Sequence, residues 1–301
     1  MMRKSAAVLI VLFLLTFVFT GCGIDKETVQ SDFSVMVSGT TTPENIRSTA
    51  EYMDDNIKKV GKDIAAQMLS AYEDYLHRYI SENPDKLQLE LLYGYYDKEK
   101  KAFNEEKIKD SEISDFYDSI RFGSLIPVCN EDSIALKINY PNLLEKYGEY
   151  ISVPMHRLYE LKAIAVEKPM SQNAALLISW EELSNRALEA EKLLKEFPGD
   201  ELVKTDAMWL YTTYLNTMLM GTTNTPIFDY STTEFSPEAR KSYERFMLDN
   251  PDATITWVLK EYFTYLYGIS YSLNFNDSTM SKVFFDTCDW LVSEAEKRVV
   301  L

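Results

Sequence analysis

Histidine, cysteine, glycine and proline are all scarce in this chain of 301 residues, which holds two, three, ten and ten of them respectively. The two histidines, His77 and His156, are far apart, and no Cys-x-x-Cys pair occurs, so the sequence predicts no zinc site. Three cysteines are too few for a disulfide-rich scaffold. Few glycines and prolines disfavour an all-β sandwich with many tight turns and favour long helices.

Catalytic and nucleotide-binding motifs are also missing. Gly61 and Lys62 lack the further glycines of a phosphate-binding loop, and the stretch from Gly268 to Ser272 lacks the closing glycine of a nucleophile elbow. Carboxylate pairs such as Glu181 and Glu182 are expected on solvated helix faces, because the chain holds 47 acidic residues. The sequence therefore predicts no catalytic residue and no cofactor.

The charge of the chain is strongly one-sided, with a formal net charge of −16 at pH 7. An acidic surface is repelled by phosphate backbones and by anionic lipid headgroups. We therefore expect no nucleic-acid partner and no membrane contact through a polybasic surface.

The first 22 residues have the layout of an export signal. Arg3 and Lys4 form a short basic region, and an apolar run follows over residues 6–19. A membrane-spanning helix needs roughly 20 apolar residues, so this run is too short to be one. The N-terminus therefore predicts export across a membrane.

The apolar run ends in the motif Phe19-Thr20-Gly21-Cys22. These residues resemble the lipobox of bacterial lipoproteins, although Phe19 stands where that family usually has leucine or another aliphatic residue. The resemblance implies that residues 1–21 are a cleaved signal peptide and that Cys22 carries diacylglycerol, which would hold the protein on the outer face of the cell membrane. An uncleaved anchor and an ordinary secreted protein are the alternatives, but the apolar run is short and no Ala-x-Ala site is present.

Small and polar residues follow the cysteine up to residue 41, and we expect residues 22–41 to form a flexible, lipid-anchored tether. Residues 42–301 are long enough for one large domain, which could consist of two subdomains that meet near residues 121–140. With Cys22 acylated, Cys129 and Cys288 remain, either as a single disulfide or as two free thiols.

Helix caps and breakers divide this domain into helices. A hydroxyl cap before Pro43 predicts a helix that runs to Asn83, with a break at Gly61, and Ser179 begins a capping box for a helix over residues 180–196. Ser236 and Pro237 begin another helix, which Asn250 and Pro251 end. The predicted fold class is mainly all-α, either an irregular array of α-hairpins or a helical bundle.

Two segments depart from a plain helical array. The stretch ALEAEKLLKEFPGDE, residues 187–201, resembles the second helix and turn of a tetratricopeptide-type repeat, but the helix-ending prolines are too unevenly spaced for regular repeats of that kind. Two short apolar runs over residues 124–138 are compatible with a small β-hairpin or with an extended crossover, and Pro127 would place the first run at an edge.

Aromatic residues are abundant, with 20 tyrosines and 15 phenylalanines. Phe263, Tyr267 and Tyr271 recur at every fourth position, and the polar connection from Gly221 to Ser236 contains Phe228 and Tyr230. These five aromatic residues form a candidate binding surface for a glycan or an extended peptide. The alternatives are packing between helices for the stripe and a packed Ω-loop for the connection.

Residues 139–200 resemble segments of exported Gram-positive proteins of unassigned function, and this resemblance implies no activity. The sequence favours a binding or scaffolding module that meets a protein partner at the bacterial cell surface, because helical arrays expose extended surfaces. An exported enzyme acting on cell-wall polymer or peptide and a solute-capture lipoprotein are the alternatives. The enzyme would need carboxylates with raised pKa values in a cleft, and solute capture usually uses alternating β and α segments.

Overall fold

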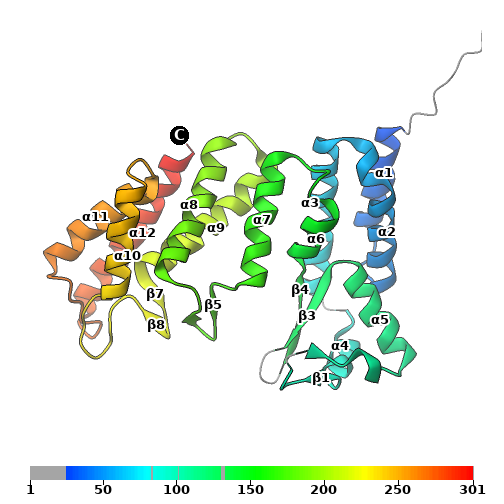
Figure 1. The fold of residues 1–301 in the computed structure, drawn as a ribbon, viewed down its shortest axis with the longest axis horizontal. Helices are drawn as coiled ribbons and strands as arrows, with labels where there is room; N and C mark the ends of the chain where they lie inside the picture. Colours follow the sequence, from blue (N-terminus) through cyan, green and yellow to red (C-terminus); the bar gives the residue numbers. More distant parts are fainter. Residues whose placement is uncertain (1–24, 83, 101, 130–132, 301) are drawn as a thin grey trace, which may run out of the picture.

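The computed structural model describes residues 25–82, 84–100, 102–129 and 133–300, and this part of the chain is mainly helical (Figure 1). None of its helices is both long and apolar enough to cross a lipid bilayer. Within these described ranges, a short 3-10 helix, η1 (Glu105–Lys107), accompanies twelve α-helices, which are α1 (Lys26–Ser38), α2 (Pro43–Val60), α3 (Lys62–Glu82), α4 (Lys86–Tyr93), α5 (Ser111–Phe122), α6 (Tyr140–Tyr147), α7 (Val153–Glu167), α8 (Trp180–Glu196), α9 (Glu201–Met220), α10 (Pro237–Asp249), α11 (Thr254–Gly268) and α12 (Ser278–Val299). The predicted all-α class is confirmed.

Strands occur in the described ranges only as antiparallel pairs, which are β1 (Tyr96–Asp97) with β2 (Ala102–Phe103), β3 (Leu125–Cys129) with β4 (Ile134–Ile138), β5 (Ser171–Gln172) with β6 (Ala175–Leu176), and β7 (Gly221–Thr222) with β8 (Thr225–Pro226). The antiparallel pair β3-β4 is the small hairpin, one of the two alternatives that the sequence left open for residues 124–138. Pro127 lies opposite Leu136 in a sheet of two strands, where both strands are edges and a missing backbone donor is tolerated. The three shorter pairs were not predicted.

Short polar side chains begin helices at the positions that the sequence indicates. Thr42 Oγ1 accepts a hydrogen bond of 3.2 Å from the backbone amide of Asn45, and Ser179 Oγ accepts one of 3.1 Å from that of Glu182. Between α2 and α3, Gly61 has a φ of +90°, which favours glycine. The predicted helix starts at both caps and the predicted break at Gly61 are confirmed.

Residues 26–38 form helix α1 instead of part of a flexible tether. Val29 and Phe33 of this helix are buried, and the ring of Phe33 stacks on that of Tyr52 in α2 at a centroid distance of 6.4 Å. The expectation of a tether is therefore wrong for this segment, because a few apolar side chains at helical spacing dock it onto α2 and α3. Residues 22–24, like the rest of the N-terminus before residue 25, lie outside the described ranges.

The helices stand side by side in an irregular row, and their inner faces share one core (Figure 1). This core extends from Phe33 in α1 to Val299 in α12, so that side chains on both sides of residues 121–140 belong to it. Four buried tyrosines, Tyr72, Tyr75, Tyr243 and Tyr262, donate their hydroxyl groups to backbone carbonyls. Tyr72, for example, donates to the carbonyl of Gly123 at 2.9 Å. Much of the tyrosine excess in the sequence therefore serves packing.

The two cysteines of the domain are free. Cys288 is buried in α12, whereas Cys129 at the end of β3 is partly exposed. The sequence allows either a disulfide between Cys129 and Cys288 or two free thiols, and the structure has the two free thiols.

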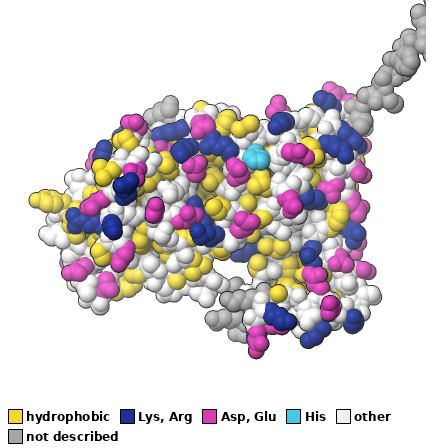
Figure 2. All heavy atoms as spheres, in the orientation of Figure 1, with side chains coloured by type: hydrophobic (Ala, Val, Ile, Leu, Met, Phe, Trp, Pro, Cys, Tyr) yellow, Lys and Arg dark blue, Asp and Glu magenta, His cyan; other side chains and the backbone are white. Residues whose placement is uncertain are grey.

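The surface mixes charges of both signs. Figure 2 shows acidic and basic side chains interspersed over one face of the molecule. Several of them pair one helical turn apart, as Arg240 does with Glu244 at 2.9 Å and Arg245 with Asp249 at 2.6 Å. Such exposed ion pairs contribute little to stability. Their main effect is to keep the surface around the apolar core hydrated.

Candidate functional site

The aromatic residues predicted in the connection between α9 and α10 have different environments. Phe228 is fully buried, and its ring makes edge contacts with Phe235 and Phe284 at centroid distances of 5.4 and 5.5 Å. Tyr230 is 61% exposed. The assignment of Phe228 to a binding surface is therefore wrong, because the middle of this connection folds back into the core.

The predicted stripe of Phe263, Tyr267 and Tyr271 does not form on one helix. Helix α11 ends at Gly268, and Tyr271 lies beyond this end with a φ of +56°. Phe263 is half-buried against the ring of Tyr271, and the guanidinium of Arg240 lies 4.3 Å from the centre of the Tyr271 ring. Tyr267 is 78% exposed. The spacing of four residues gave a wrong prediction of a helical stripe, because α11 ends at Gly268, before Tyr271.

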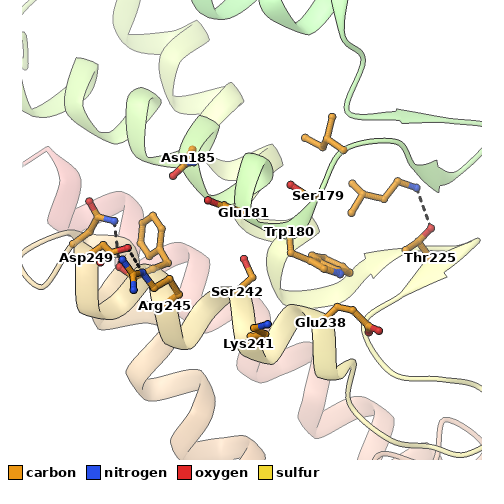
Figure 3. A pocket seen from close by; sticks show the side chains of 14 residues that line it. Ser179, Trp180, Glu181, Asn185, Thr225, Glu238, Lys241, Ser242, Arg245 and Asp249 are labelled. Atoms are coloured by element: carbon orange, nitrogen blue, oxygen red, sulfur yellow. Dashed lines mark hydrogen bonds and ion pairs between the residues drawn. The ribbon is translucent and has the colours of Figure 1, made fainter.

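A groove of about 560 Å³ lies between α8 and α10, and hairpin residues close one end of it (Figure 3). Ile178, Trp180 and Phe246 line its floor and are each less than a tenth exposed. The Trp180 ring packs edge-on against Tyr243 at 6.1 Å, and the hydroxyl of Tyr243 donates to the buried carbonyl of Met218. The floor is therefore an apolar surface held rigidly by packing.

The local sequence explains how α8 and α10 present these residues. The cap at Ser179 makes Trp180 the first residue of α8, and Ser236 caps α10 in the same way by accepting from the amide of Ala239 at 3.2 Å. Along α10, the residues Ser242, Phe246 and Asp249 fall on one face, because positions three and four apart are neighbours on a helix. Two predicted caps thus fix both walls of the groove.

The hairpins β5-β6 and β7-β8 are joined to each other at the end of the groove. The backbone amide of Leu176 in β6 donates to Thr225 Oγ1 in β8 at 3.0 Å, and that of Asn224 donates to the carbonyl of Ala174 at 2.8 Å. Thr225 belongs to the polar connection from residue 221 to 236 and lines the groove, whereas Phe228 of the same connection is in the core.

Polar groups without partners face the groove. The Ser242 hydroxyl is buried and makes no hydrogen bond with any described residue, and Figure 3 shows it directed from α10 toward α8. Glu181 and Asn185 on α8 and Lys241 on α10 likewise make no side-chain hydrogen bond or ion pair within the described part of the chain. The unpaired Ser242 hydroxyl is therefore available to pair with a ligand or with water in the groove.

Neither histidine nor cysteine occurs among the residues that line the groove. No cluster of three or more histidine, cysteine, aspartate or glutamate side chains suited to a metal ion occurs among the described residues. His77 and His156 lie on α3 and α7 and do not line the groove. The apolar floor and the hydroxyl, amide and charged groups of the groove suit binding by shape, hydrogen bonds and charge.

Most groove residues were not predicted, because they come from segments far apart in the chain. Trp180 was recognised only as part of a capping box, and nothing in the local sequence pairs Ser242 with it. A possible signal was the combination of the capping box at Ser179 with the unusually polar connection before α10, since both border the groove. No protein-family model, curated protein or solved structure matches the chain, so the site rests on its own geometry.

Proposed function

We propose that this chain is a lipid-anchored module on the outer face of a bacterial cell membrane, and that it binds an extended peptide segment of a partner protein in the groove between α8 and α10. The observation that carries the proposal is the unpaired Ser242 hydroxyl over an apolar floor, between walls that bear free groups of both charges. No chemical step is assigned to the protein.

The composition of the groove favours a peptide over other ligands. Its volume of about 560 Å³ lies within the range of ~300 to 1,000 Å³ that is usual for ligand sites. The floor around Trp180 can take an apolar side chain, while Ser242 and Asn185 can pair with backbone amide groups. Glu181 and Lys241 can each meet an opposite charge on the peptide. A nucleic acid would be repelled by the net charge of −16.

The location rests on the N-terminal sequence, which lies outside the described residues. The motif Phe19-Thr20-Gly21-Cys22 supports acylation of Cys22. Two acyl chains on one cysteine bury enough methylene groups, at ~0.8 kcal/mol each, for stable anchoring. The acidic surface gives no other means of holding an anionic membrane.

Selection of peptides tests the binding proposal. Immobilised full-length protein in detergent would be screened against a display library of random peptides, in parallel with a Ser242→Phe variant and a Leu248→Ala variant. The larger side chain at residue 242 would fill the groove, whereas Leu248 lies on α10 outside it and is 77% exposed. All three proteins would first be compared by thermal unfolding to confirm that they fold.

The proposal requires peptides with a shared apolar residue that bind the native protein and the Leu248→Ala variant but not the Ser242→Phe variant. Affinities would be measured on synthetic peptides by calorimetry. Absence of any enriched peptide, or equal binding to the Ser242→Phe variant, would refute the groove as a peptide site.

A further inference from the structure

A second hollow, of about 400 Å³, opens between α3, α7 and α9 and shares no residue with the peptide groove. Glu73 and Lys162 line it and are 5% and 7% exposed. Asp206 and Trp209 of α9 lie at its rim, where the Asp206 side chain is 46% exposed and Trp209 is 64% exposed. Charged side chains are almost never buried so deeply unless they are paired, so the inner part of this hollow needs an explanation.

The buried carboxylate of Glu73 is saturated by protein donors. Its Oε1 accepts from the hydroxyl of Tyr140 at 2.6 Å and from Lys162 Nζ at 2.5 Å, and its Oε2 accepts from the hydroxyl of Tyr159 at 2.5 Å. Burial alone would raise the pKa of Glu73. A hydrogen bond from His77, together with the charge and hydrogen bond of Lys162, outweighs burial and lowers the pKa to about 2. Glu73 is therefore a fixed negative charge with no oxygen to spare for a ligand.

The rim offers the groups that a ligand could reach. Asp206 Oδ2 pairs with Lys162, and no further hydrogen bond of the Asp206 carboxylate occurs with the described residues, so its other oxygen remains available. Trp209 follows three residues later on the same face of α9 and leaves its large ring in solvent. A carboxylate oxygen beside an exposed indole face is the combination that attracts a cation.

The sign of the local charge supports this choice. Lys162 is shared by Glu73 and Asp206, and Asp74 acts on the same groups through its charge. Even with His77 protonated, the three carboxylates of Glu73, Asp74 and Asp206 outnumber the two cations, Lys162 and His77. An anionic ligand would have to displace Asp206 from Lys162 beside the remaining carboxylates, whereas a cation adds to a site that is net negative. The net charge of −16 attracts cations to the whole molecule.

We propose that this hollow binds a small organic cation, an ammonium or guanidinium group on a short apolar carbon chain. The free oxygen of Asp206 accepts hydrogen bonds from the cation, and the ring of Trp209 covers it. The carbon chain lies against Ala165 and Leu210, which also line the hollow. The buried pair of Glu73 and Lys162 does not touch the ligand but holds Asp206 in place and sets the charge of the site.

A purely structural role for the buried pair is the competing explanation. Buried ion pairs often stabilise a fold no better than apolar side chains of the same size, and breaking one is costly. Such a role would connect α3 to α7 and α9, yet it would require neither the hollow nor the exposed indole of Trp209. Variants at the rim therefore separate the two explanations, because they leave the contact between Glu73 and Lys162 intact.

Calorimetric titration of the full-length protein in detergent tests the proposal. The probes are n-butylammonium, n-butylguanidinium and, as an anion of matching length, butyrate. The variants are Asp206→Asn, which keeps the shape of the rim but removes its charge, and Trp209→Ala. Trp290→Ala is the matched control, because Trp290 is 49% exposed on α12 and lies outside the hollow.

Both cations are expected to bind and butyrate is not. The Asp206→Asn change should weaken cation binding by about tenfold or more, and Trp209→Ala by roughly two- to thirtyfold, while Trp290→Ala leaves it unchanged. Ser242→Phe should also leave it unchanged, which separates this site from the peptide groove. Failure of both cations to bind at millimolar concentration, binding of butyrate in their place, or unaltered cation affinity in the rim variants would overturn the proposal.

Discussion

The carboxylate of Glu191 in α8 accepts a hydrogen bond of 2.6 Å from the backbone amide of Thr254, the first residue of α11. Its second oxygen accepts one of 3.0 Å from the amide of Ile255. Ala253, at the position where a capping side chain would stand, has none to offer. Glu191 is 2% exposed, so α11 is capped from another helix at a site closed to water.

Replacement of Glu191 by alanine should destabilise the fold by roughly 2 to 4 kcal/mol, because two buried amides lose a charged acceptor. Urea unfolding followed by circular dichroism would measure this change. Glu189→Ala is the control, since Glu189 is exposed on the same helix and pairs only with Lys192, so its effect should stay within about 0.5 kcal/mol. Equal stability of the two variants would show that the cap of α11 is unimportant.

A substitution of Gly221 by alanine should cost about 1 to 3 kcal/mol. Gly221 has a φ of +74°, and an added Cβ would lie 2.5 Å from the carbonyl oxygen of Thr225. Gly199→Ala is the matched control, because a Cβ there meets nothing within 4 Å. Thermal unfolding of both variants distinguishes them, and a Gly221→Ala protein as stable as the control would contradict the strained turn at the start of β7.

The environments of Phe228 and Tyr230 predict opposite results for the same kind of truncation. Phe228→Ala should cost roughly 3 to 5 kcal/mol, because it removes a ring packed inside the core. Tyr230→Ala should change stability by about 0.5 kcal/mol or less, since this side chain is mostly in solvent. Denaturant unfolding of both variants gives the comparison. Similar losses would mean that the connection between α9 and α10 is not folded as described.

The pKa of Glu73 predicts a dependence of stability on acid. The pKa is lowered from 4.5 to about 2 in the folded chain, so the corresponding stabilisation is present above pH 4.5 and is lost as the pH falls toward 2. This fall in pKa corresponds to roughly 3 kcal/mol. Between about pH 5 and pH 2 the native protein should therefore lose more unfolding free energy than a Glu73→Gln variant. Parallel pH profiles would contradict the ionised state of Glu73.

The proposed acylation of Cys22 predicts a change of location in the Cys22→Ala protein. Without the thiol, no diacylglycerol can be attached, and the protein should be left uncut or released. Labelling of bacterial cells with a radioactive or alkyne fatty acid, followed by membrane fractionation, would measure both effects. A Cys22→Ala protein that is still acylated and processed would exclude the lipoprotein proposal.

Local signals predicted the parts of the fold that depend on neighbouring residues. Thr42 and Ser179 each accept from a backbone amide three residues later, and such a cap can be recognised from a short stretch of sequence. The small hairpin formed by β3 and β4 was also within reach, because its two strands are close together in the chain. Helix α1 was missed because a few buried side chains in a polar segment resemble a tether.

Contacts between distant residues left no local signal. Glu73 and Lys162 are 89 positions apart, and Glu191 and Thr254 are 63 apart. Each of these glutamates looks like one more acidic residue on a helix surface in a chain rich in such residues. Only the packing of helices shows that their carboxylates are buried, and the same holds for Ser242 in the groove.

The two long edges of the row of helices are not equivalent. Figure 1 shows the start of α1 and the end of α12 along one edge, and the hairpins β1-β2, β5-β6 and β7-β8 along the other. With lipid on Cys22, each residue up to α1 would add at most ~3.5 Å of reach, so the first edge would rest close to the headgroups and the hairpins would point outward. The groove, lined by Thr225 at the hairpins and Asn250 at the end of α10, would then stand upright on the bilayer, and a captured peptide would lie along the membrane normal.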